Sequence, residues 1–101
     1  MYAKIDTATS GAGNTIVAAV AGKQIRVTGY VLNALTAVTA QWYTGTSAAL
    51  SGPIALGATG TFVCPNDDGD GHFETVAGEA LKLTLGGAVQ VSGHVRYRLI
   101  G

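Results

Sequence analysis

The chain has 101 residues, of which 48% are hydrophobic and only 12% charged, with 15 glycines and a formal net charge of zero at pH 7. This composition predicts one small folded domain over 1–101 and excludes intrinsic disorder, which requires high charge and low hydrophobicity. The charge balance offers no basic stripe for nucleic acid, and the longest nearly apolar run, 16–21, is far too short to cross a bilayer. The N-terminal residues also lack the pattern of a signal peptide. A weakly charged surface is poorly protected against self-association, which favours a subunit of an assembly.

Apolar and polar residues alternate along most of the chain, which predicts strands with one face on a core. The expected strands, in chain order, are 2–7, 14–20, 24–34, 37–44, 53–56, 60–64, 72–75, 80–85 and 88–100. Glycine-rich turn signals separate them. The sequence therefore predicts an all-β fold: a single-domain antiparallel β-sandwich, jelly-roll-like, with about eight or nine short strands.

Two pairs of residues in the central strands are candidates for an interface. Tyr30 and Leu32 fall on the nominally polar face of their strand, although a bulge at Gly29 would return both to the core. Trp42 and Tyr43 are neighbours on one strand, so one of them points inward and the other outward. Exposed aromatic side chains are typical anchors of protein interfaces.

The charged residues are segregated along the chain. Five of the six acidic residues fall in the range 67–79, whereas Arg96 and Arg98 share one face of the last strand with His94. Such segregation suits complementary contacts between copies or with a scaffold, and the alternative is a solvated face with incidental clustering. The candidate interface residues are Tyr30, Leu32, Tyr43, Arg96 and Arg98.

Two segments share one pattern: VAGKQIRVT at 20–28 and VAGEALKLT at 76–84. They either form a two-fold pseudo-repeat, with an equivalent turn and strand in each half, or reflect the common way in which a sheet turns a corner. Two copies are fewer than the three or more that repeat architectures usually need.

The segment NDDGDG, at 66–71, partly matches the pattern of a calcium-binding loop. Such a loop also needs a bidentate glutamate at its twelfth position, where this chain has Ala77, and two flanking helices, where strands are expected. We therefore expect a variable acidic loop at Asp67, Asp68 and Asp70 and no metal site. Weak opportunistic binding of Ca²⁺ by the clustered carboxylates is the alternative.

Candidate catalytic residues are few. Cys64 and His72 could pair across a hairpin, but no family signature surrounds either residue. A half-buried cysteine usually behaves as a small inert hydrophobe, and a lone cysteine excludes an internal disulfide. We expect no enzymatic activity and no cofactor.

Most of the chain resembles a group of small all-β proteins encoded in the structural gene clusters of tailed bacteriophages. The resemblance lies in TATSGAGNTIVAAVAGKQIRVTGYVL and in FETVAGEALKLTLGGAVQVSGHVRY. The matching positions are Asn14 to Val20, Gly22, Lys23, Ile25 to Val27, Phe73 to Thr75, Gly78, Glu79, Leu81, Leu83, Val91, Gly93, His94 and Tyr97. The range 35–70 matches least, and NDDGDG lies outside the shared pattern.

The resemblance implies a virion structural protein at the capsid surface, assembled in the bacterial host cytoplasm. Its implied role is that of a capsid decoration (cement) protein that binds the major capsid protein as an oligomer, expected as a homotrimer. The alternative is a receptor- or glycan-binding module of a head spike or tail fibre, with the loop 64–72 and either Trp42 or Tyr43 at its tip. Neither nucleic acid nor a membrane is an expected partner.

Overall fold

A computed structural model describes residues 1–45, 48–66 and 71–101, and within these ranges the protein consists of strands and the turns between them. None of the described segments is a helix long and apolar enough to cross a membrane. The strands are β1 (Tyr2–Thr7), β2 (Gly11–Val17), β3 (Gln24–Ala34), β4 (Val38–Thr44), β5 (Ala48–Ala49), β6 (Ile54–Leu56), β7 (Thr61–Cys64), β8 (Phe73–Glu74), β9 (Leu81–Leu85) and β10 (Val91–Ile100). All the expected strands are present, and β5 is an addition. The largest shift is in β2, which ends at Val17 because the next three residues are exposed and lead into a turn.

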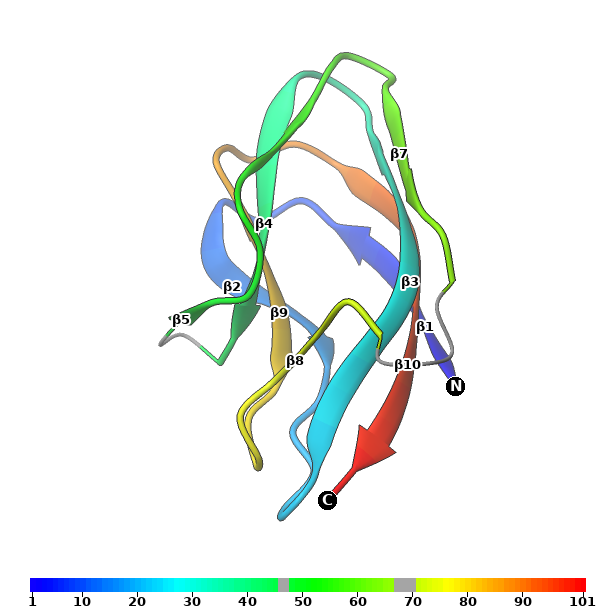
Figure 1. Cartoon of the computed structure of the whole chain (residues 1–101). Helices are drawn as coiled ribbons and strands as arrows, with labels where there is room; N and C mark the ends of the chain where they lie inside the picture. The colour runs from blue at the N-terminus through cyan, green and yellow to red at the C-terminus, as the bar shows by residue number, and fades with distance from the viewer. Residues whose placement is uncertain (46–47, 67–70) are drawn as a thin grey trace.

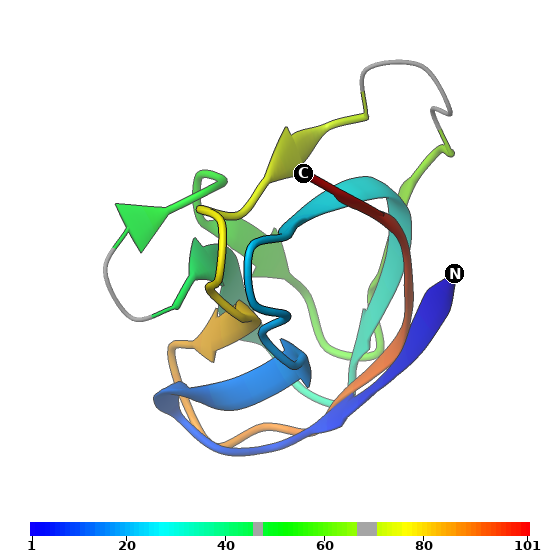
Figure 2. The same cartoon turned by 90° about the horizontal axis from the view of Figure 1, so that it is seen from below.

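The strands form two antiparallel sheets that face each other (Figures 1 and 2). Sheet I has the order β1-β10-β3-β7, and β8 also pairs with β3. Sheet II has the order β2-β9-β4-β5, and β6 also pairs with β4. If β5 and β6 count as one interrupted strand, and β7 and β8 as another, this order is that of a jelly roll. The predicted fold class is therefore confirmed.

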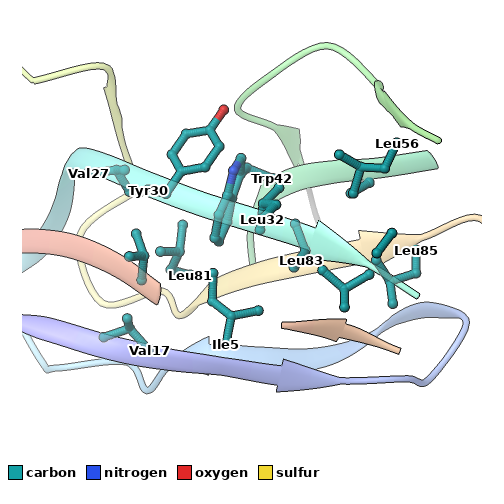
Figure 3. Packing of buried hydrophobic residues seen from close by; sticks show 14 of the residues in the cluster. Ile5, Val17, Val27, Tyr30, Leu32, Trp42, Leu56, Leu81, Leu83 and Leu85 are labelled. Carbon is teal, nitrogen blue, oxygen red and sulfur yellow. The ribbon is translucent and has the colours of Figure 1, made fainter. Parts of the chain in front are cut away.

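One hydrophobic core fills the space between the two sheets (Figure 3). Trp42 is its largest side chain and is 0% exposed. The other large apolar side chains with less than 2% exposure are Ile5, Ile25, Val27, Leu32, Leu81, Leu83, Leu85, Val91 and Val95. They come from both sheets at alternate positions, as the period of two predicts.

A bulge in the middle of β3 changes which residues face this core. β10 pairs with Val27 and with Gly29 at successive residues, so Thr28 is one residue in excess. Before the bulge Val27 points inward, and after it Tyr30 and Leu32 do, with exposures of 6% and 0%. The expectation that Tyr30 and Leu32 form an interface is therefore wrong, and the alternative of a bulge that returns them to the core is correct.

The two VAG segments form the same kind of turn. In 20–23 and in 76–79 the amide of the fourth residue donates to the carbonyl of the first at 3.0 Å. The third residues, Gly22 and Gly78, have φ of 72° and 83°, as a type II turn requires. The turns also touch, because Gly78 N–H donates to the carbonyl of Lys23 at 2.9 Å. The shared pattern thus produces equivalent turns, which lead into β3 of one sheet and β9 of the other.

Candidate functional site

Basic and aromatic side chains gather on the outer face of sheet I, where β1 and β10 pair. The register places Tyr2 opposite Arg96 and Lys4 opposite His94. All four residues are exposed, Tyr2 by 72%. Side chains of directly opposite residues lie on the same face of a sheet, so these four form one surface, which we call the basic patch.

The alternation of each strand explains why this surface faces solvent. On β10, the fully buried Val95 lies between the exposed His94 and Arg96. On β1, the buried Ile5 follows the exposed Lys4. The apolar residues anchor both strands to the core, and the basic residues between them must point outward.

Three shallow hollows meet at Arg96, which lines all of them. The first, of about 280 Å³, extends from Arg96 toward Tyr97 and the chain start. The second, of about 460 Å³, runs along Lys4 and His94, and the third, of about 290 Å³, runs toward Val63. A partner can therefore approach the Arg96 guanidinium, with its fork of five N–H donors, from three sides.

The ion pairs found among residues 1–45, 48–66 and 71–101 do not include the basic patch. Among the residues that the structure describes, no acidic side chain pairs with Lys4, His94 or Arg96. The acid nearest in register, Asp6, accepts a hydrogen bond from Gln90 Nε2 at 2.6 Å. Positive groups that are close together and unpaired favour an anionic partner.

The structure separates the residues that the sequence predicts as one interface. Arg96 is exposed on the same face as His94, as predicted, and Arg98 is half-buried at the rim of the first hollow. Tyr43 is half-buried on sheet II, opposite Lys82, and so lies on a different surface. The sequence reasoning missed Tyr2 and Lys4. Their alternation with buried neighbours is visible in the sequence, but their pairing with the last strand is not.

Trp42 belongs to an aromatic cluster inside the core. Its ring centroid lies 5.2 Å from that of Tyr30, in an edge-to-face arrangement, and 6.1 Å from that of Phe73. Among the described residues the indole N–H has no hydrogen-bond partner of ordinary geometry, although its position near Tyr30 opposes part of the rise in the pKa of that side chain. Because Trp42 is fully buried, it cannot form the tip of a receptor-binding module, and that part of the alternative reading is wrong.

The acidic loop residues Asp67, Asp68 and Asp70 lie outside the described residues, so the expectations for this loop are neither confirmed nor contradicted. In the rest of the chain, no three His, Cys, Asp or Glu side chains are placed to hold one metal ion.

Cys64 and His72 make separate contacts. His72 Nε2 lies 2.8 Å from the carbonyl oxygen of Pro65, whereas Cys64 lies directly opposite Tyr30 on the neighbouring strand. Burial raises the pKa of the Cys64 thiol, and a hydrogen bond with Tyr30 only partly opposes this. The thiol is therefore protonated at neutral pH, and the thiolate is the form needed for nucleophilic chemistry.

Comparisons with known proteins add no relative. No protein-family model matches the chain, and neither a curated protein nor a solved structure does. The resemblance to small phage proteins therefore depends on the quoted motifs alone.

Proposed function

We propose that this protein is a structural component of a tailed-bacteriophage particle, with a binding rather than a catalytic role. Its simplest role is that of a decoration protein that attaches to the capsid surface through the basic patch. The observation that carries this proposal is the convergence of three hollows on Arg96, which forms no ion pair with any acidic residue that the structure describes. The motif resemblance supplies the viral setting, and jelly rolls are common in capsid and lectin domains. Because a fold alone does not define a function, the attachment is argued from the patch.

The patch fits an acidic surface of the major capsid protein. Arg96 would bind a carboxylate in bidentate fashion, while Lys4 adds positive charge beside it and His94 adds a ring nitrogen that can form a hydrogen bond. Tyr2 would supply apolar contact area at the edge of the same surface. A capsid displays its sites in many copies, so a modest affinity per contact is enough when neighbouring subunits are linked.

The proposal is tested by co-sedimentation of the purified protein with expanded capsids of its phage. Arg96→Glu places a negative charge at the centre of the patch and should weaken binding at least about tenfold. Lys23→Glu is the matched control, because it makes the same charge change at an exposed turn outside the patch and should leave binding unchanged. Added salt should weaken the binding of the wild-type protein to capsids and reduce the difference in binding between the wild type and Arg96→Glu. Failure of the wild type to bind, or equal binding by Arg96→Glu, would contradict the proposal.

A further inference from the structure

The strand β7 forms an open edge of sheet I. It pairs with β3 along one side, and in the described part of the chain no strand pairs with its other side. Three of its four residues are exposed, Phe62 by 38% and Val63 by 60%. This edge is therefore accessible to another chain.

The register shows which backbone groups point outward. Leu32 lies opposite Phe62, and two residues along the same ladder Ala34 N–H donates to the carbonyl of Gly60 at 3.1 Å. In an antiparallel pair, hydrogen-bonded and non-bonded positions alternate, so Phe62 directs its backbone groups toward β3. Thr61 and Val63 consequently turn their N–H and C=O groups away from the sheet.

Within its four residues, β7 carries no charged side chain, no proline and no bulge that would hinder pairing with another chain. Monomeric β-proteins commonly protect their edges with charged side chains, prolines or bulges. The sequence contains no charged residue anywhere in 27–66, which includes all of β7. By contrast β1, at the opposite edge of sheet I, carries the exposed charges of Lys4 and Asp6.

The aromatic core also reaches the surface at β7. The Phe62 ring stacks on Tyr30, with centroids 5.7 Å apart and an interplanar angle of 25°. Tyr30 in turn contacts Trp42 and Phe73. Since Phe62 is the exposed end of this cluster, the group that covers it should be apolar, and another aromatic ring would extend the stacking.

We propose that β7 pairs with β7 of a second copy of this chain, antiparallel, around a two-fold axis at Phe62. Thr61 then faces Val63 of the second copy through two hydrogen bonds, the reciprocal pair adds two more, and the two Phe62 side chains lie opposite each other. A two-fold contact brings identical surfaces together, so a charged residue in it would lie near the same charge on the second copy. The β7 edge carries no charged residue. Once two copies have paired, neither has an open β7 edge left for a third copy. The basic patch of each copy stays accessible.

This inference does not depend on the proposed attachment to capsids. It also differs from the homotrimer that the resemblance implies, because a two-fold contact of this kind closes as a dimer.

The association is tested by size-exclusion chromatography with light scattering. The wild type should have the mass of a dimer and dissociate on dilution. Val63→Lys adds the charge that protects natural edges and should raise the dissociation constant at least about tenfold. Val76→Lys is the control, since Val76 is a similarly exposed valine, at 54%, outside β7, and it should leave the dimer intact. A wild type that is monomeric up to about 0.1 mM, or trimeric, overturns the proposal.

The register is tested by disulfide trapping in a Cys64→Ala background. Thr61→Cys and Val63→Cys proteins, when mixed, should cross-link, because directly facing Cα atoms are about 5.5 Å apart and disulfides span about 4.4–6.8 Å. Each variant alone should cross-link weakly, because identical positions are then two residues out of register. Efficient cross-linking of Val63→Cys alone, or none in the mixture, overturns the proposed pairing. If the wild type is monomeric and Val63→Lys abolishes its binding to capsids, β7 pairs with a strand of the capsid protein. That result would likewise overturn the proposed pairing with a second copy.

Discussion

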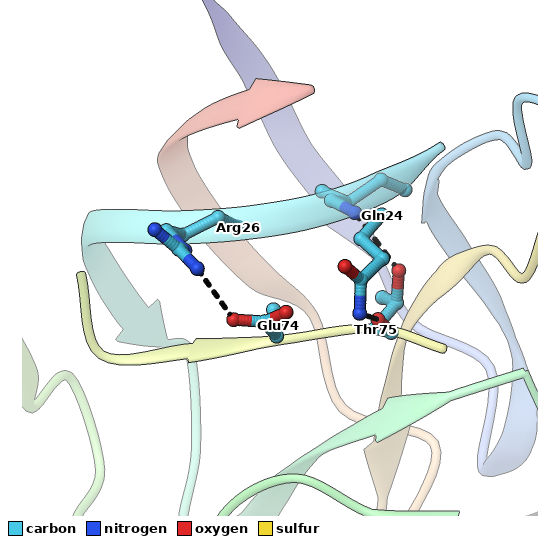
Figure 4. A network of polar contacts seen from close by, with 5 residues as sticks. Gln24, Arg26, Glu74 and Thr75 are labelled. Atoms are coloured by element: carbon cyan, nitrogen blue, oxygen red, sulfur yellow. Dashed lines mark hydrogen bonds and ion pairs between the residues drawn. The ribbon is translucent and has the colours of Figure 1, made fainter. Parts of the chain in front are cut away.

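Two short strands, β7 and β8, pair with the same edge of β3, but they are attached to it by different forces. β8 is attached by polar bonds: Arg26 forms an ion pair of 2.8 Å with Glu74, and the neighbouring Thr75 bonds to the backbone of β3 (Figure 4). β7 pairs with β3 through its backbone, and its side-chain contact with β3 is the aromatic stacking of Phe62 on Tyr30. It carries no charge. The difference teaches that two strands can extend the same edge of β3, one fixed to it by side-chain bonds and the other leaving an uncharged outer edge for a partner.

The polar attachment is centred on Thr75, which is 1% exposed. The amide of Ile25 donates to Thr75 Oγ1 at 2.9 Å, and the amide of Thr75 donates back to the carbonyl of Ile25 at 3.0 Å. Gln24 Nε2 donates to the carbonyl of Thr75 at 3.2 Å. These bonds pair the hydroxyl, the N–H and the C=O of Thr75, so the residue that follows β8 is fixed to β3 on all three groups.

The largest expected effect comes from Gly29→Val, at the bulge between the two attachments. A Cβ at Gly29 would lie 2.9 Å from Cα of Asn66 and 3.2 Å from the carbonyl oxygen of Cys64. We expect a loss of about 3 kcal/mol in the free energy of unfolding, because the backbone that follows β7 must shift. Hydrogen exchange should show a greater loss of protection in β7 than in β8. Gly87→Val, where a Cβ meets nothing within 4 Å, should be nearly neutral, and equal effects of the two substitutions would contradict the prediction.

Thr75→Val should break the polar attachment selectively. The change keeps the shape of the side chain but leaves the amide of Ile25 buried without its acceptor, at a cost of about 1–3 kcal/mol. Denaturant unfolding measures this loss, and the amides of β8 should lose protection before those of β7. Thr39→Val, at an exposed position, serves as the control. Unchanged stability in Thr75→Val would mean that the polar attachment contributes little.

Tyr30→Phe should make the attachment of β7 less sensitive to alkaline pH. Burial, and secondarily the nearby Cys64, raise the pKa of Tyr30 above its ordinary value of 10.0. The folded state therefore retains this proton more tightly than the unfolded state, so stability is unaffected below about pH 10 and falls as pH rises further. At neutral pH the free energy of unfolding of the variant should be about 1 kcal/mol lower, because the variant lacks the hydroxyl and its polar contacts. Above pH 10 the stability of the variant should fall less steeply than that of the wild type. Urea unfolding between neutral pH and pH 11 tests this, with the exposed Tyr2→Phe as the control; parallel curves for the wild type and Tyr30→Phe would refute it.

The smallest expected effect comes from the ion pair of Arg26 with Glu74. The two side chains are 26% and 36% exposed, so a double-mutant cycle with Arg26→Met and Glu74→Gln should give a coupling of about 0.5 kcal/mol. This coupling should decrease when salt is added, whereas the effect of Thr75→Val should not. A coupling above about 2 kcal/mol that salt does not change would show that the pair behaves as a buried one.

Local alternation was enough to locate the strands and most of the core. Ile5, Leu83 and Val95 each lie between two polar residues in the sequence, and each is fully or almost fully buried. The alternation failed after Gly29, because the bulge depends on β10 and on the segment at Asn66 that crosses Gly29 closely. Gly29 made a bulge one of two alternatives, but nothing within 24–34 decided between them for Tyr30 and Leu32.

The candidate site was predictable only in part, for a similar reason. His94 and Arg96 share a face by their spacing alone, so the sequence predicted their half of the basic patch. The half contributed by Tyr2 and Lys4 requires the pairing of the first strand with the last, which joins the two ends of the chain.

The sequence by itself determined the spacing of the strands and the absence of charge from 27–66. The alternation that predicts the strands and the lack of charge are both properties of neighbouring residues, so they can be read without knowing which strands pair. Only the tertiary structure decided that β7, within that uncharged stretch, lies at the edge of a sheet, and that the basic residues of two distant strands share a face. The physical reason is that edges and shared faces arise from pairing between residues far apart in the chain, which packing of the whole core selects.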